Sequence, residues 1–172
     1  LYLVGCINEI GNKQKADNVS GLLGESSLRD EIKNGGLDGT DGFILRIGID
    51  NFKEINENKG LDYGDMILRK TAECIKEVLL TDQKLYKIVA DEFIVMDFGG
   101  RNEEDARNMY DRICARIGSF IKDNQYEVFY TVSAGIKCFS GADNISDSEL
   151  MKLSEFALNE AKNGGRNKCY VY

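Results

Sequence analysis

Apolar and polar positions along this chain of 172 residues follow two periodicities, one typical of strands and one typical of helices. Short apolar runs rich in branched and aromatic side chains predict strands in residues 42–50, 84–88, 92–98, 127–139 and 168–172. Apolar side chains that recur every three or four positions predict amphipathic helices in residues 62–80, 103–122 and 147–163. This βααββαβ series predicts an α+β fold with a five-stranded, mostly antiparallel sheet flanked by helices.

Two shorter helices are predicted from their end signals. Residues 26–36, SSLRDEIKNGG, begin with serines suited to capping a helix and stop at a glycine pair. A second short helix is expected to begin near Asn51, with the side chain of Asp50 as its N-terminal cap. Because the residues up to Asn18 include a polar connector, we expect a leader over residues 1–18 and one domain over residues 19–172.

Composition narrows the possible partners and chemistry. With 29 acidic and 22 basic residues the net charge is -7, which argues against nucleic acid or an anionic membrane surface as a partner. No apolar stretch approaches the roughly 18 to 20 residues that span a bilayer. Five cysteines without a CxxC pair are typical of reduced thiols in the cytoplasm, with a membrane anchor elsewhere in a larger protein left open. Since histidine is absent, chemistry has to rely on carboxylates, lysine, tyrosine or a metal held by oxygen.

Five stretches carry a resemblance to a known family: ADNVSGLLGESSL, GIDNFKEINENKGLDYGDMIL, VADEF, TVSAGIKCF and EFALNEAKNGGRNKCYVY. In this order and at these separations they resemble the GGDEF family, the diguanylate cyclase domains that join two GTP molecules into cyclic di-GMP. The resemblance implies a nucleotidyl-cyclase-like palm fold in a bacterial signalling protein, with a neighbouring output domain such as an EAL phosphodiesterase, and leaves a homodimer open. Residues 1–18 are similar to the last strand and exit helix of a PAS sensor domain.

The resemblance also implies a metal site, and here the sequence departs from the family. In the family, an aspartate on the first strand and the acidic residue after a glycine pair hold divalent metal ions such as Mg²⁺. The matching positions are Gly48 and Asp91, and Val89 and Ala90 replace the glycine pair, so that valine is expected to crowd the nucleotide and to resist positive φ. Asp50 lies about 6.6 Å farther along the strand than position 48, so we do not expect it to substitute.

Glu92 completes the acidic pair at this turn. Asp91 and Glu92 are therefore the catalytic candidates implied by the resemblance, with Asp91 a metal ligand whose partner position holds glycine. The alternative is that both are carboxylates at the end of a hairpin without a function in catalysis.

Several residues match positions that bind the nucleotide in the family. Asn56 and Asp65 match the guanine-contacting residues, and an amide and a carboxylate suit the donors and acceptor of the guanine edge. The family's nucleotide motif is also matched by Phe52 and Lys53, and its triphosphate-binding basic residues by Lys162 and Arg166. Ordinary structural roles remain open, such as a turn cap for Asn56, a helix-dipole interaction for Asp65 and a core position for Phe52.

Three functional hypotheses follow from this pattern. The first is a degenerate GGDEF domain that is catalytically impaired and acts as a regulatory module sensing GTP. The second is an active diguanylate cyclase that uses Mg²⁺ and tolerates the changes. The third is a dimerisation scaffold that binds no nucleotide. Mg²⁺ is expected only if activity or GTP binding is retained.

Overall fold

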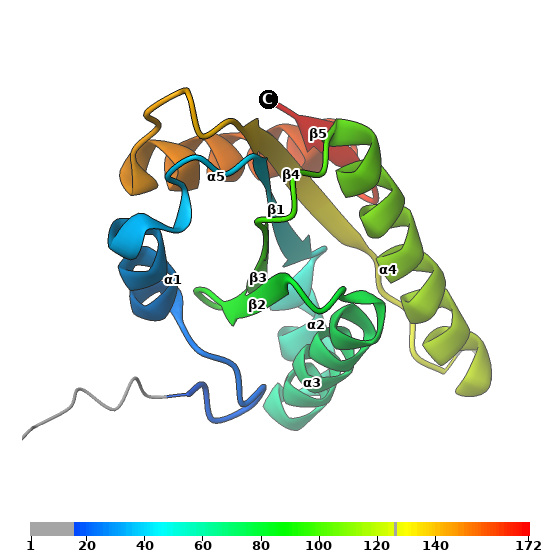
Figure 1. The fold of residues 1–172 in the computed structure, drawn as a ribbon. Helices are drawn as coiled ribbons and strands as arrows, with labels where there is room; N and C mark the ends of the chain where they lie inside the picture. Colours follow the sequence, from blue (N-terminus) through cyan, green and yellow to red (C-terminus); the bar gives the residue numbers. More distant parts are fainter. Residues whose placement is uncertain (1–15, 126) are drawn as a thin grey trace, which may run out of the picture.

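The structure, a computed structural model, describes residues 16–125 and 127–172 of the chain (Figure 1). The leader expected over residues 1–18, with its PAS-like strand, lies outside the described residues except for positions 16–18. The division into leader and domain therefore stays a prediction.

The described chain forms a five-stranded sheet. Its strands are β1 (Gly42–Ile49), β2 (Gln83–Lys87), β3 (Glu92–Asp97), β4 (Val132–Phe139) and β5 (Cys169–Val171). Their order across the sheet is β2-β3-β1-β4-β5, with a parallel β4–β5 pair and antiparallel pairing elsewhere. The predicted α+β fold with a mostly antiparallel sheet is confirmed.

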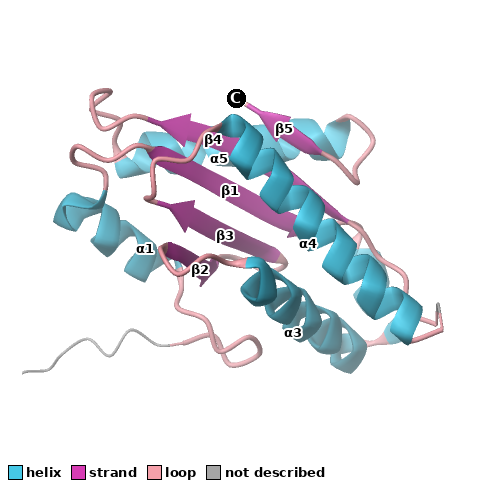
Figure 2. Cartoon of the chain, turned by 45° about the vertical axis from the view of Figure 1, so that its right-hand side comes forward, coloured by secondary structure: helices cyan, strands magenta, loops and turns pink. Residues whose placement is uncertain are grey.

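Helices cover both faces of this sheet (Figure 2). They are α1 (Glu25–Glu31), the π-helix η1 (Ile32–Gly36), α2 (Phe52–Lys59), α3 (Leu61–Val78), α4 (Glu103–Asp123) and α5 (Asp147–Asn163). In Figure 2, α3 and α4 lie in front of the sheet and α1 and α5 lie behind it. Within the described ranges, no helix is long and apolar enough to cross a membrane.

Strand β1 shows how the two faces are built, because successive side chains of a strand point to opposite sides. Phe43, Leu45 and Ile47 belong to the apolar core that contains side chains of α3 and α4. Ile44 belongs to a second core with α1 and α5. The even-numbered positions of β1, including Arg46 and Gly48, therefore face α5.

Of the five α-helices in the described ranges, α4 and α5 begin with a side-chain cap, whereas α1, α2 and α3 do not. Asn102 and Asp105 form a reciprocal capping box at the start of α4, and Ser146 accepts a hydrogen bond from the Glu149 amide at the start of α5. The prediction of serine caps for the helix in residues 26–36 was wrong. Helix α1 begins at Glu25 after Gly24, which makes no side-chain cap, and Ser27 is buried inside the helix.

The strand expected over residues 127–139 is shorter than predicted. Its partner β1 ends at Ile49, opposite Val132, so the ladder that would order residues 127–131 as a strand is missing. These residues still contribute to the core, because Val128 and Tyr130 are buried and the Tyr130 hydroxyl lies 3.0 Å from Thr71 Oγ1. Burial of alternating apolar side chains produced the strand-like pattern without strand pairing.

Candidate functional site

The end of β1 and the turn between β2 and β3 meet helix α5 at Gly48. A Cβ atom placed on Gly48 would lie 2.8 Å from Lys162 Nζ and 3.3 Å from Leu158 Cδ2, both on α5. Lys162 Nζ also lies 3.7 Å from Asp91 Oδ2, in the turn just before β3. The fold therefore brings together three of the positions singled out in the sequence, with the lysine ammonium beside the glycine and the carboxylate.

Asp91 sits in a partly desolvated position. Burial raises the pKa of its carboxyl group above the usual value, and the positive charge of Lys162 opposes this rise without cancelling it. The Asp91–Lys162 contact is thus an ion pair that compensates only part of the cost of burying the carboxylate.

The neighbouring carboxylate, Glu92, is held by an arginine that sequence reasoning did not single out. Arg46 on β1 is 5% exposed, and its Nε and Nη2 atoms each lie 2.7 Å from Glu92 Oε2. Arg46 Nη1 also donates to the Met151 carbonyl on α5, at 3.4 Å. The available signal was one charged side chain inside the apolar run GFILRIGI, since a buried arginine requires a partner. We call Arg46, Asp91, Glu92 and Lys162 the β1–β3–α5 cluster.

The turn between β2 and β3 bears on one of the two expectations about Val89, its resistance to positive φ, while crowding of the nucleotide stays a prediction. Positive φ falls on Ala90, at 48°, and Val89 is 61% exposed. The buried ammonium of Lys87 donates to the Ala90 carbonyl and lies 5.4 Å from the centre of the Phe93 ring. Its pKa is lowered by burial, against the charges of Asp17, Asp91 and Glu92. The turn thus places positive φ at Ala90 and not at the β-branched Val89. The hydrogen bond from Lys87 to the Ala90 carbonyl stabilises this conformation.

The cap predicted for Asp50 was wrong. Asn51 is the N-cap residue of α2, at φ 55°, and no side chain makes a capping hydrogen bond to this helix. Asp50 is instead buried and accepts hydrogen bonds from Thr131 Oγ1 and Ser133 Oγ, both at 2.7 Å, and from the Asn167 amide at 3.0 Å. A carboxylate engaged by three donors connects β1, β4 and the segment before β5, an arrangement that depends on residues far apart in the sequence.

Helices α2 and α3 place Asn56 against Gly64. The Asn56 Oδ1 atom is buried without a hydrogen-bond partner, and a Cβ on Gly64 would stand only 1.7 Å from it. Asp65 follows Gly64 in the first half of α3, is partly exposed, and makes no hydrogen bond or ion pair with other described residues. We call Asn56, Gly64 and Asp65 the α2–α3 cluster, in which an acceptor and a carboxylate remain unpaired.

The remaining predicted residues occupy three different environments. Phe52 packs against the core beside α3. Lys53 is largely exposed, and its ammonium lies 3.7 Å from Glu57 on the same helix. Arg166 is exposed at φ 63°, and its guanidinium makes no hydrogen bond or ion pair with other described residues. Among the described residues, neither Lys53 nor the Arg166 guanidinium makes a hydrogen bond or ion pair with Lys162 or Asp91.

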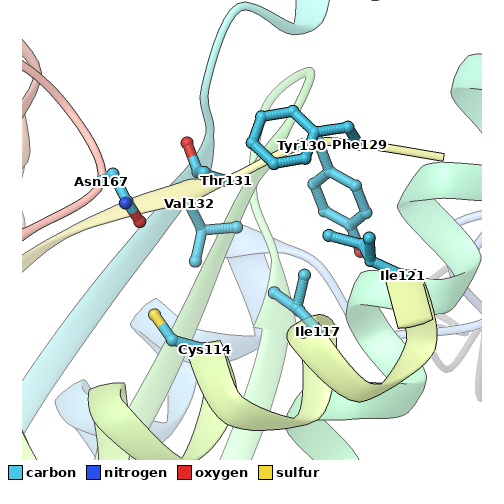
Figure 3. A pocket seen from close by; sticks show the side chains of 9 residues that line it. Cys114, Ile117, Ile121, Phe129, Tyr130, Thr131, Val132 and Asn167 are labelled. Atoms are coloured by element: carbon cyan, nitrogen blue, oxygen red, sulfur yellow. The ribbon is translucent and has the colours of Figure 1, made fainter. Parts of the chain in front are cut away.

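A cavity of about 200 Å³ lies between α4 and the segment leading into β4 (Figure 3). Figure 3 shows Ile117 and Ile121 of α4 on one side and Tyr130 and Val132 on the other. None of the site residues predicted from the sequence lines this cavity. In the part of the chain that the structure describes, no group of three or more Cys, Asp and Glu side chains is arranged to hold a metal ion.

Comparison with known proteins gives one consistent family. A family described as "Diguanylate cyclase, GGDEF domain" matches residues 17–168. The bifunctional diguanylate cyclase/cyclic di-GMP phosphodiesterase MucR of Pseudomonas aeruginosa is 29% identical over 124 residues, which cover 72% of this chain and 18% of that protein. The cyclic di-GMP phosphodiesterase PdeR of Escherichia coli is 27% identical over 158 residues, covering 91% of this chain and 24% of that protein. The chain thus spans less than a quarter of the length of either relative.

A solved structure supports the fold. The crystal structure of the GGDEF domain of DgcB from Caulobacter crescentus, in complex with c-di-GMP, matches with a TM-score of 0.78 at 22% identity. The match covers 91% of this chain and 94% of that chain. At this level of identity the likeness shows the shared fold.

Proposed function

The chain belongs to the GGDEF domain family of diguanylate cyclases, and we propose that it is a GTP-sensing regulatory domain of a bacterial cyclic di-GMP signalling protein, impaired in catalysis. The observation that carries this proposal is the contrast between the two clusters. The α2–α3 cluster keeps unpaired groups suited to guanine, whereas the carboxylates of the β1–β3–α5 cluster are paired with cations of the protein.

Impaired catalysis follows from the chemistry of joining two nucleotides. A 3′-hydroxyl has to attack an α-phosphate in line, and metal ions activate the nucleophile and stabilise the charge that develops. Gly48 offers no ligand, Asp91 faces Lys162, and Glu92 is held by Arg46. The residues present therefore do not fit a site for two Mg²⁺ ions, and we assign no catalytic step to Asp91 or Glu92.

Guanine recognition is supported by the α2–α3 cluster. A buried carbonyl oxygen without a partner costs roughly 1 to 3 kcal/mol, which an N–H donor of a ligand would recover. Guanine presents such donors next to a carbonyl acceptor, whereas adenine presents a donor in place of that acceptor. Asn56 and Asp65 are therefore proposed as the base-binding residues, with Lys162 and Arg166 available to the phosphates. Phe52 and Lys53 are proposed to support this site from α2.

The rest of the signalling protein is also part of the proposal. Because the relatives are much longer than this chain, we propose that a PAS-like input domain and an EAL-like output domain accompany it in one protein. We also propose that this domain lies in the cytoplasm. Binding of GTP would then alter the contact between this domain and its neighbours or a second copy of itself.

Calorimetric titration with GTP and with ATP tests the proposal. GTP is expected to bind in the micromolar range or weaker, and more tightly than ATP, because the adenine edge mismatches Asn56 and Asp65. Incubation with GTP and Mg²⁺ should give no cyclic di-GMP by chromatography. A product peak that disappears in Asp91→Asn would instead support an active cyclase. Equal binding of both nucleotides, or binding of neither, would contradict guanine sensing and favour a scaffold.

A further inference from the structure

We propose that the ammonium group of Lys162 replaces a divalent metal ion beside Asp91, so that this domain holds nucleotide phosphates without metal. The part that concerns the nucleotide rests on the function proposed above, whereas the replacement of the metal is a property of the site itself. Sequence reasoning assigned Lys162 to the phosphates alone, and its contact with Asp91 and Gly48 comes from the fold.

The position of Lys162 is the first step. Its Nζ atom lies 3.7 Å from Asp91 Oδ2, and a Cβ on Gly48 would stand 2.8 Å from Nζ and 3.0 Å from Cε. A two-carboxylate site would have to be built from positions 48 and 91, and the lysine occupies the space beside both. Mg²⁺ requires a near-octahedral set of oxygen ligands at about 2.0 to 2.1 Å, which this arrangement does not supply.

The balance of charge is the second step. Lys162 faces Asp91 and Arg46 faces Glu92, so each carboxylate already has a cationic partner. The buried ammonium of Lys87 adds a third positive charge that interacts with both carboxylates. A divalent ion at Asp91 would have to displace Lys162 from the carboxylate, and the neighbouring charges of Arg46 and Lys87, which also interact with Glu155 and Asp17, already balance the rest of the cluster.

Access to the ligand is the third step. The Lys162 side chain is 25% exposed and belongs to the last turn of α5, so its flexible stem lets the ammonium meet an anion from solvent while it remains near Asp91. Arg166, four residues later, is exposed, and its guanidinium makes no hydrogen bond or ion pair with other described residues. The two side chains can supply to phosphates the positive charge that a metal ion would otherwise bring.

The first experiment uses Mn²⁺ alone, followed by electron paramagnetic resonance. We compare the wild-type chain with Gly48→Asp, Lys162→Met and the double variant, and use Lys152→Met, an exposed lysine of the same helix, as the matched control. Only the double variant should bind Mn²⁺, at least about tenfold more tightly than the wild type, because it has two carboxylates and no ammonium between them. In Gly48→Asp alone the new carboxylate should pair with Lys162.

Several results of the Mn²⁺ experiment would overturn the proposal. They are saturable binding to the wild type that Asp91→Asn abolishes, equal binding to Gly48→Asp and the double variant, and absence of binding to a folded double variant. Circular dichroism checks the fold, and Lys162→Gln takes the place of Lys162→Met in the double variant if the latter does not fold.

The second experiment titrates GTP in EDTA and in Mg²⁺. The two dissociation constants should agree within about threefold, and Lys162→Met should weaken binding in EDTA by about tenfold while Lys152→Met leaves it unchanged. A tenfold gain in GTP affinity on adding Mg²⁺ would overturn metal-free phosphate binding. If GTP binds under neither condition, guanine sensing is wrong and so is the phosphate-binding part, and the Mn²⁺ experiment still decides whether Lys162 replaces a metal ion.

Discussion

The α2–α3 cluster and the β1–β3–α5 cluster differ in how their polar groups are satisfied. In the α2–α3 cluster, the buried Asn56 Oδ1 has no hydrogen-bond partner, and the Asp65 carboxylate makes no hydrogen bond or ion pair with other described residues. In the β1–β3–α5 cluster, both carboxylates are paired, Asp91 with Lys162 and Glu92 with Arg46. The first cluster therefore has polar groups without partners in the protein. In the second cluster, the carboxylates already form ion pairs within the protein.

Under the proposed function, the two clusters would be parts of one nucleotide site, one of which keeps its ligand-binding groups while the other does not. Base recognition needs groups that are left unpaired in the free protein, and leaving one buried acceptor unpaired costs stability. Metal chemistry needs several carboxylates whose repulsion only a cation relieves. With glycine at position 48 this repulsion is smaller, and our proposal is that Lys162 takes the place of the cation while the base-binding groups are kept.

The largest expected effect comes from breaking the buried ion pair of the β1–β3–α5 cluster. Arg46→Met should lower the free energy of unfolding by about 3 kcal/mol, because Glu92 would keep its charge without a partner. Urea denaturation measures the loss. Adding Glu92→Gln should recover much of it, since no charge then remains uncompensated.

A matched control separates this effect from the loss of any arginine. Arg116 forms an ion pair with Glu77 at half-exposed positions, and Arg116→Met should cost less than about 1 kcal/mol. If Arg46→Met and Arg116→Met lower stability equally, the pair with Glu92 has no special importance for the fold.

The second prediction tests the α2–α3 cluster through its carboxylate. Asp65→Ala should lower the affinity for GTP by roughly 10- to 100-fold and leave the affinity for ATP nearly unchanged, because only guanine loses an acceptor for its N–H groups. Calorimetry with both nucleotides measures the preference. Asp62→Ala, at an exposed acidic position in the first turn of the same helix, is the control and should keep it. An unchanged preference in Asp65→Ala would leave Asp65 with a role in the helix alone.

The third prediction separates stability from binding at Gly64. In Gly64→Ala the new methyl group would displace the Asn56 side chain, so GTP binding should fall by about tenfold. The gain in helix propensity of up to about 1 kcal/mol opposes the cost of moving Asn56 away from the new methyl group beside Phe52, so stability should change by less than about 1 kcal/mol. Thermal unfolding and GTP titration of the same variant give both quantities. A variant that is less stable but binds GTP normally would contradict the role assigned to this contact.

The smallest effect concerns the seating of α5, the helix that carries Lys162. Arg29 of α1 lies 3.0 Å from Asp147 in the first turn of α5, and this contact lowers the pKa of Asp147. A lowered carboxyl pKa contributes stability that is present above the unfolded value of 3.8 and is lost as pH falls through the folded value. For this partly exposed pair the contribution should stay below about 1 kcal/mol.

Urea unfolding at pH 7 and pH 3 measures this contribution. Asp147→Asn should reduce the difference in stability between the two pH values, since the substituted side chain no longer titrates. An unchanged difference would mean that other carboxylates account for the loss of stability in acid.

Much of the fold was predictable from periodicity, because the pattern of a strand or helix is set by which face it buries. The three long amphipathic helices and the β2–β3 hairpin were correctly placed, to within a few residues at their ends. Errors occurred where a tertiary partner decides the outcome. Residues 127–131 look like a strand but have no partner strand, and Asp50 looks like a cap but binds donors from β4 and from Asn167.

Residue types and their order were enough to predict the α+β class and the family, and they show that position 48 carries no carboxylate. Only the tertiary structure decided that Arg46 holds Glu92 and that Lys162 lies beside Gly48 and Asp91. Each of these contacts joins residues at least 46 positions apart. The packing of α5 on the sheet sets the distances between these charged side chains, and the strength of each ion pair depends on those distances. A local sequence pattern contains no information about them.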